Sequence, residues 1–189
     1  MIYFWESKLC NDALLRPSLI YFDPRYSNLT KPHPIITTPA GNPYEVNKCV
    51  IQLRMLSGRY PDDWLTRHWS ENKSGDCVLC LDTMGDLGHF LSSCKTLEGL
   101  RLSLFQWWLS FDPLNVPLTE LLDSRIKSDR FSFVRFVLDP SADKDSISLM
   151  QQDETTIDSL FKLTRTYCFS LHKRRRQLLS DISNQNLGS

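Results

Sequence analysis

Three cysteines and one histidine fall within a short stretch, and this cluster constrains the fold more than any other feature. The donors follow the pattern C-x2-C-x8-H-x4-C and are Cys77, Cys80, His89 and Cys94. A Cys-x2-Cys pair on a tight turn can bring two sulfur atoms together, and a nearby His and Cys at a helix end can complete a tetrahedron. Thiolate and imidazole donors in a closed site suit zinc best. The sequence therefore predicts a zinc knuckle within residues 75–100.

Two other interpretations of the cluster stay open, namely unrelated buried thiols and a redox-active Cys-x2-Cys pair. A thioredoxin-like pair is expected at the start of a helix that follows a strand, and this sequence does not indicate that context. The chain has six cysteines and no leader-like apolar segment, which favours a reducing intracellular setting, nuclear or cytoplasmic. Four protein donors leave no coordination position for water, so we expect the metal to be structural.

Length and charge limit the classes of function. The 189 residues are 41% hydrophobic, which is enough for one core of ordinary size. The chain has 22 basic and 22 acidic residues, so any nucleic-acid binding must come from a local basic patch. No apolar run is long enough to span a bilayer. We therefore expect a single domain with no membrane partner and no small-molecule substrate.

The distribution of prolines and apolar residues predicts three segments and a mostly α-helical fold. Residues 1–42 are proline-rich and aromatic and are expected to be extended. Residues 43–180 are expected to form one helical domain that includes the knuckle. Residues 181–189 are expected to be a flexible tail.

The first well-marked helix is expected to begin at Asn42, which can cap it, with Pro43 in the first turn and an end at Gly58. Its apolar positions recur at helical spacing and are Val46, Val50, Leu53 and Leu56. Cys49 lies beside this stripe and is expected to be a buried structural thiol.

Further helices are expected after the knuckle. The apolar positions of the next one are Leu97, Leu100, Leu104, Trp107 and Trp108. The two tryptophans suit a core, although base stacking is an alternative. A helix around residues 118–122 and another at 131–138 follow; the latter could instead be a strand, because it is rich in β-branched and aromatic residues. A polar hinge is expected at 141–145.

The last element is predicted to be a long amphipathic helix from about 154 to 179. Acidic residues lie near its start, and the basic residues Lys173, Arg174, Arg175 and Arg176 lie near its end, which suits the helix dipole. The basic run is a candidate phosphate-binding site, with affinity that falls as salt rises. An ordinary solvated helix end is the alternative.

Three weaker signals could point to other chemistry. The sequence Tyr60-Pro-Asp62-Asp63 resembles the metal-binding turn of reverse transcriptases, but the two flanking strands and the further carboxylate that two-metal catalysis requires are not indicated. We instead expect one of these aspartates to cap a short helix. His68 is expected to pack or hydrogen-bond rather than bind metal, as is the pair Cys168 and His172.

Several segments together with the knuckle resemble the C-terminal region of animal non-LTR retrotransposon polyproteins, downstream of the reverse transcriptase. They include Lys31-Pro-His-Pro-Ile, Asn42-Pro-Tyr-Glu-Val, Ile51-Gln-Leu-Arg-Met-Leu-Ser-Gly-Arg-Tyr and Asp63-Trp-Leu-Thr-Arg-His-Trp-Ser. The resemblance implies zinc binding by Cys77, Cys80, His89 and Cys94 and a role in handling nucleic acid. No polymerase or endonuclease would fit in this chain, so we expect no enzymatic activity.

The predicted function is therefore a non-catalytic zinc-binding module that supports RNA or single-stranded DNA template binding. An upstream reverse transcriptase domain is a possible partner. The alternative is a protein-interaction module whose zinc is purely structural and which makes no direct nucleic-acid contact.

Overall fold

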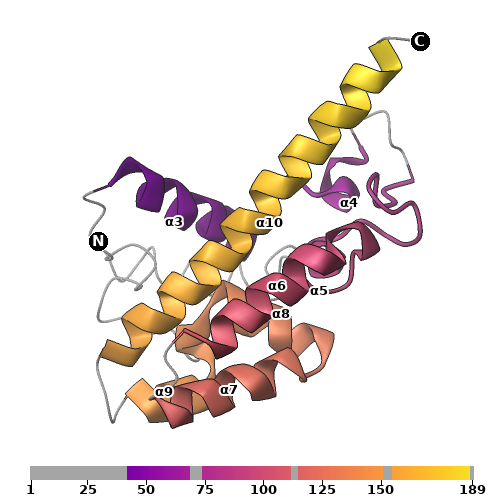
Figure 1. The fold of residues 1–189 in the computed structure, drawn as a ribbon. Helices are drawn as coiled ribbons and strands as arrows, with labels where there is room; N and C mark the ends of the chain where they lie inside the picture. The colour runs from indigo at the N-terminus through magenta and orange to yellow at the C-terminus, as the bar shows by residue number, and fades with distance from the viewer. Residues whose placement is uncertain (1–41, 69–73, 112–114, 151–154, 188–189) are drawn as a thin grey trace, which may run out of the picture.

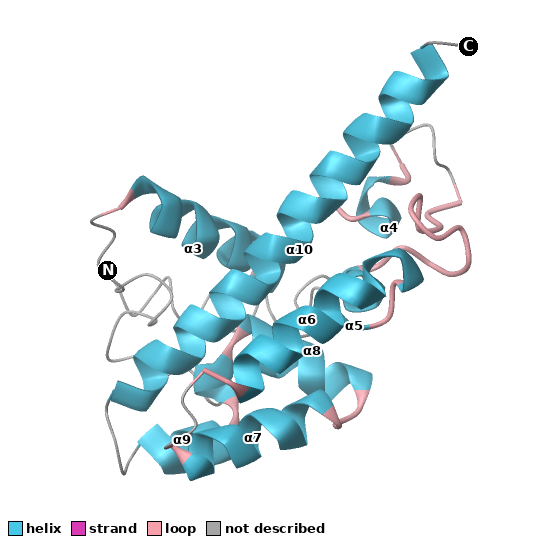
Figure 2. Ribbon diagram, viewed as in Figure 1, coloured by secondary structure: helices cyan, strands magenta, loops and turns pink. Residues whose placement is uncertain are grey.

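The computed structural model describes residues 42–68, 74–111, 115–150 and 155–187. This part of the chain is mostly helical, as expected from the sequence, and contains no strand (Figure 2). Asp76 and Met84 form an isolated antiparallel bridge. Within these ranges, each helix is either too short or too polar to cross a membrane. The predicted extended segment, residues 1–42, lies outside the described residues except for Asn42.

The last helix is the axis of the molecule. Helix α10 (Thr155–Leu187) runs diagonally across Figure 1, with α3 (Pro43–Leu56) on one side and α6 (Glu98–Leu109) and α8 (Arg130–Leu138) on the other. Its C-terminal end extends beyond the body. The helix continues past the predicted end at 179 into the predicted tail, because no glycine or proline occurs between Leu179 and Gly188.

An aromatic cluster fills the core between α6, α8 and α10. Trp108 of α6 is 1% exposed, and its ring lies 5.2 Å from that of Tyr167 on α10. Phe105 stacks on the same tyrosine at 5.7 Å, and Phe133 meets it edge-on at 5.8 Å. Trp108 is thus a core residue, whereas Trp107 is only half-buried and packs against Phe111. Such ring contacts add to the stabilisation from burial.

Helix α3 has the predicted ends but a different buried face. The Tyr44 amide donates to the Asn42 side chain at 2.8 Å, and Gly58 has φ +63° just after the helix. Of the predicted apolar stripe only Leu56 is buried; the prediction is wrong for Val46, Val50 and Leu53, which are 36–40% exposed. The buried residues are Lys48, Ile51, Gln52, Met55 and Leu56.

A polar contact explains why α3 buries a different face from the predicted one. The buried Gln52 amide donates to the Val137 carbonyl at 2.7 Å and to the Thr164 hydroxyl at 3.1 Å. These bonds fix the face that meets α8 and α10. Apolar residues occur all round α3, so their spacing did not identify the buried face.

The region between residues 115 and 150 is helical throughout most of its length. Helix α7 (Val116–Ile126) begins at Asn115, whose side chain accepts from the Leu118 amide. Residues 131–138 form α8 and not a strand, because Asp129 caps them and the apolar side chains repeat at helical spacing. The predicted hinge at 141–145 is wrong: a 3-10 turn, η3 (Pro140–Ala142), leads directly into α9 (Lys144–Met150).

Candidate metal centre

A loop and a short helix carry the four predicted ligands. Cys77 and Cys80 lie on a tight turn that the Leu81 amide closes by donating to the Cys77 carbonyl at 2.8 Å. Leu81 has φ +55°, which belongs to the left-handed region. Helix α5 (Leu87–Ser92) carries His89, and Asp86 caps it. Cys94 begins the 3-10 turn η2 (Lys95–Leu97).

The structure brings all four predicted ligands together. The Sγ atoms of Cys77 and Cys94 are 3.8 Å apart, and Cys80 Sγ lies 3.3 Å from His89 Nε2. All four ligand atoms lie within 4.8 Å of one another, so the cluster can hold a metal ion. Cys77, His89 and Cys94 are buried and Cys80 is half-buried. Such an enclosed set of donors fits a structural site better than an open catalytic one.

Hydrogen bonds to the second ring nitrogen orient His89. Its Nδ1 lies 2.9 Å from the Thr83 hydroxyl and 3.3 Å from the Ser93 hydroxyl. A proton on Nδ1 satisfies this contact and leaves the Nε2 lone pair directed at the sulfur atoms. Metal-binding histidines commonly have such a partner on the ring nitrogen that does not bind the metal.

The contact between the Cys77 and Cys94 thiols also shifts their pKa values. The hydrogen bond with Cys94, together with burial, raises the pKa of Cys77 to about 11. The same contact lowers the pKa of Cys94. Cys94 is therefore the first of the pair to become a thiolate, and metal binding would have to release the proton held by Cys77.

Asp63 connects the knuckle to α10. It begins α4 (Asp63–Thr66), and its carboxylate accepts from the Val78 amide at 3.3 Å and from the Arg175 guanidinium at 2.7 Å. The Asp63 and Arg175 side chains are 10% and 11% exposed. Gly85 permits this approach, since a Cβ there would lie 2.7 Å from Asp63 Cβ. The knuckle loop, α4 and α10 thus share one buried ion pair.

A second contact joins the same parts of the molecule. Tyr60 is 2% exposed, stacks on Phe90 at 5.3 Å and places its hydroxyl 3.0 Å from His172 Nδ1. Burial raises the pKa of Tyr60 to about 12, so the hydroxyl keeps its proton and shares a hydrogen bond with the imidazole. His172 therefore faces Tyr60, while the Cys168 thiol lies buried near the Val137 carbonyl.

The two aspartates after Tyr60 have structural partners. Asp62 caps α4 by accepting from the Leu65 amide at 2.7 Å, which confirms the predicted aspartate cap. Burial raises the pKa of Asp62 to about 6. Asp63 pairs with Arg175, and no strand flanks this turn in the described ranges. His68 is exposed and is not among the clustered ligand atoms.

The basic residues of α10 divide into two kinds. Lys173, Arg174 and Arg176 are exposed, whereas Arg175 points inward to Asp63 and also donates to the Pro61 carbonyl at 3.2 Å. No local pattern predicts this difference, because the partner of Arg175 lies 112 residues away.

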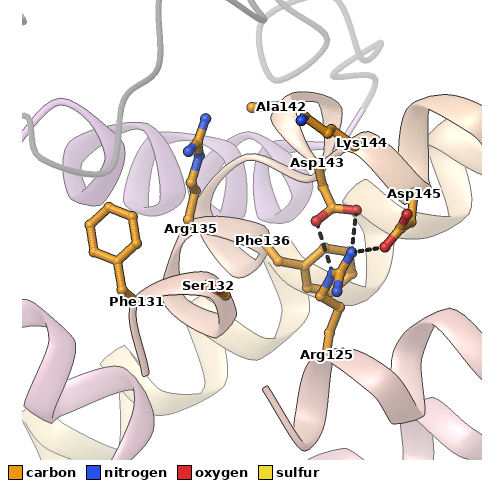
Figure 3. Close-up of a pocket in the computed structure, with 9 residues that line it drawn as sticks. All are labelled: Arg125, Phe131, Ser132, Arg135, Phe136, Ala142, Asp143, Lys144 and Asp145. Carbon is orange, nitrogen blue, oxygen red and sulfur yellow. Dashed lines mark hydrogen bonds and ion pairs between the residues drawn. The ribbon is translucent and has the colours of Figure 1, made fainter. Parts of the chain in front are cut away.

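A hollow of about 300 Å³ lies between α7, α8, η3 and α9 (Figure 3). On its wall, Arg125 Nε lies 2.8 Å from Asp143 Oδ2, and Arg125 also pairs with Asp145. Phe131 stands on the opposite side of the hollow. Both acidic side chains of the wall are thus held by one guanidinium, which braces α7 against the start of α9.

Comparisons of the chain with protein-family models, with curated proteins and with solved structures find no match.

Proposed function

We propose that this protein is a zinc-stabilised helical module that binds RNA or single-stranded DNA and has no catalytic activity of its own. It would support template binding by a reverse transcriptase, in keeping with the resemblance to the C-terminal region of non-LTR retrotransposon polyproteins. The observation that carries the proposal is the convergence of Cys77, Cys80, His89 and Cys94.

Two distances within the cluster are close to those expected around a zinc ion. With Zn–S bonds of about 2.3 Å, tetrahedral angles separate two sulfur ligands by about 3.8 Å. The observed separation of Cys77 and Cys94 Sγ is 3.8 Å. A sulfur and a nitrogen ligand would be separated by about 3.6 Å, against 3.3 Å for Cys80 Sγ and His89 Nε2. The ion would connect the loop that carries Cys77 and Cys80 to α5 and to the start of η2. Its role would therefore be to stabilise the fold.

The exposed basic side chains of α10 support the nucleic-acid part of the proposal. Lys173, Arg174 and Arg176 project from the helix on either side of the buried Arg175. Three cations within four residues can neutralise neighbouring phosphates. The Asp63–Arg175 ion pair holds this stretch of α10 beside the knuckle, so the metal centre would fix the position of the basic side chains.

One surface favours the alternative, a protein-interaction module. Val46, Val50 and Leu53 form an exposed apolar stripe on α3, and Tyr44 on the same helix is 50% exposed. Contiguous apolar surface often marks contact with another protein. A domain placed upstream in a longer polyprotein is a suitable partner for this stripe.

Metal analysis tests the zinc. Purified protein should contain one zinc ion per chain, and Cys77→Ser combined with Cys80→Ser should abolish it. Cys49→Ser is the matched control, because Cys49 lies outside the cluster and should leave the metal content unchanged. Wild-type protein without bound zinc would contradict the proposal.

A charge series tests the nucleic-acid binding. The triple change Lys173→Gln, Arg174→Gln and Arg176→Gln should weaken binding to labelled single strands. It should also reduce the slope of log K against log salt by about 2, at about 0.7 per lost phosphate contact. A control with Lys127→Gln, Lys144→Gln and Lys162→Gln removes the same charge elsewhere and should keep the slope. Absence of binding at low salt would favour the protein-interaction module.

A further inference from the structure

An exposed tryptophan lies next to the ion pair that joins the knuckle to α10. Trp64 is the second residue of α4, directly after Asp63, and 40% of its surface is exposed. The Arg67 guanidinium lies over its ring, with Cζ 3.6 Å from the ring centroid. Arg67 also donates to the Trp64 carbonyl. The two side chains thus form a stacked pair of flat groups, one aromatic and one cationic.

The inner edge of this pair packs on the knuckle. Gly75 has φ +74°, and a Cβ at that position would lie 2.9 Å from Trp64 Cε3 and 3.1 Å from Arg67 Cδ. The Trp64 amide donates to the Gly85 carbonyl at 3.2 Å. The pair is therefore fixed by contacts on its inner side, while much of the indole surface stays open to solvent.

The surrounding charges leave Arg67 available for an anionic ligand. Asp62 caps α4 and Asp63 pairs with Arg175, so both neighbouring carboxylates are engaged. Of the carboxylates that the structure describes, none forms an ion pair with Arg67. The guanidinium is instead held by its own helix and by the indole.

From this geometry we propose that Trp64 and Arg67 form a base-stacking platform for a single-stranded nucleic acid. The proposal rests on the proposed function, in which Lys173, Arg174 and Arg176 bind the phosphates of the same strand. Arg175 reaches α4 from between these cations, so the platform and the basic side chains are held on neighbouring elements (Figure 1). Flat aromatic and guanidinium faces bind unpaired bases, whereas a duplex conceals its base faces by stacking.

The platform adds a kind of recognition that charge alone does not give. Stacking tolerates any base, because every base has a π-face, so we expect little sequence preference. Stacking also contributes affinity without releasing counterions, so its contribution should persist as salt rises, whereas that of the basic residues should fade.

Fluorescence anisotropy on the zinc-loaded full chain tests the platform. The probes are a labelled oligothymidylate of about 20 nucleotides and a duplex of the same length. Trp64→Ala should weaken binding to the single strand about 5- to 150-fold, which corresponds to one stacked base, and leave the salt slope unchanged. Trp64→Phe should restore most of the affinity because it keeps an aromatic face.

Two further variants separate stacking from structure. Arg67→Lys keeps the charge but loses the flat guanidinium, and it should weaken single-strand binding several-fold. Phe131→Ala removes an aromatic side chain that is 44% exposed on α8 and should leave single-strand binding unchanged. Zinc content and the melting temperature of each variant show whether the fold is intact.

Each result has a definite meaning. Trp64→Ala with wild-type affinity, alongside a basic triple variant that fails to bind, would overturn the platform and leave the proposed function standing. Equal losses in Trp64→Ala and Trp64→Phe, with lower melting temperatures, would show a structural role and overturn the platform. Tighter binding of the duplex than of the single strand would also overturn it. Failure of wild-type protein to bind either probe would overturn the proposed function itself.

Discussion

The knuckle (residues 74–97) and the helical body around α10 both bury their central side chains, but with different groups. In the body, Trp108, Phe136 and Tyr167 are at most 1% exposed and belong to one cluster of buried apolar side chains. In the knuckle, Cys77, Cys94 and His89 are at most 4% exposed. The Cys77 sulfur contacts that of Cys94, and His89 contacts the Cys80 sulfur and the Thr83 hydroxyl. The body is packed mainly by apolar side chains, whereas the knuckle brings together groups that could share one metal ion.

This difference predicts unequal stability within one chain. Buried thiols and an imidazole without a metal leave polar groups poorly satisfied, while aromatic side chains gain free energy simply by leaving water. Local regions can open separately when few apolar contacts tie them to the remainder. Phe90 and Leu91 of α5 contact the body core, so we place the boundary between the two regions at α5.

Metal removal should have the largest effect and should be confined to the knuckle. Zinc binding to small Cys/His peptides contributes about 10–16 kcal/mol, and the knuckle would lose this stabilisation. We expect a chelator to make the amides of residues 74–86 exchange rapidly, while those of α6 and of α10 up to Leu171 stay protected. Hydrogen exchange read out by mass spectrometry measures this contrast. If the amides of α6 and of residues 74–86 exchanged equally fast after chelation, the two regions would not differ in their dependence on the metal.

The converse experiment destabilises the body and spares the metal. Trp108→Ala leaves a large cavity among Phe105, Phe133 and Tyr167 and should lower the free energy of unfolding by about 4 kcal/mol. Urea denaturation measures the loss, and zinc content should remain one ion per chain. Trp107→Ala is the control, because this neighbour is half-buried and its loss should be smaller. Loss of zinc from folded Trp108→Ala would mean that the body sets the ligand geometry.

How much of each region could be predicted from the sequence depends on how far apart in the sequence the contacting residues are. The four candidate metal ligands and the helix caps at Asn42 and Asp62 involve neighbours in the sequence, so local spacing predicted them, whereas the cap at Asp129 is local but was not predicted. The buried face of α3 depends on Gln52 reaching Val137 and Thr164, and no local pattern encodes those partners. The inward direction of Arg175 was missed for the same reason.

The ion pair between the regions offers a test of their coupling. Arg175→Gln leaves the Asp63 carboxylate buried without its cation, which should cost about 3 kcal/mol. Arg174→Gln is the matched control, and this exposed neighbour should change the free energy of unfolding by less than about 0.5 kcal/mol. Thermal or urea unfolding of the zinc-loaded variants checks both values. A cost for Arg175→Gln no larger than that of its control would show that the two regions are energetically independent here.

The smallest expected effect concerns pH. Burial, and then the charges of Arg176, Arg175 and Arg54, lower the pKa of His172 below its usual value of about 6.5. At this residue the unfolded chain therefore binds a proton that the folded chain does not, and the contribution of His172 to stability should fall as pH drops below about 6.5. The slope from this one group is at most about 1.4 kcal/mol per pH unit.

A variant isolates the contribution of His172. His172→Gln keeps a hydrogen-bond acceptor for Tyr60 but cannot titrate, so its unfolding free energy should depend less steeply on pH between about 5.5 and 7. Urea titrations of the two proteins at matched pH values supply the comparison. If the unfolding free energies of the two proteins had the same dependence on pH, protonation of His172 would not contribute to the pH dependence of stability.

The position of α10 in the chain has a consequence for folding during synthesis. Helix α10 is the final described element to leave the ribosome, yet α3, α6 and α8 all pack on it, and both Tyr60 and Asp63 find their partners 112 residues later. A nascent chain that ends before Thr155 exposes the apolar faces of α3, α6 and α8, which are prone to association in that state. The knuckle can gather its ligands early, because they are close in sequence, but its ion pair with α10 can form only after Arg175 has emerged.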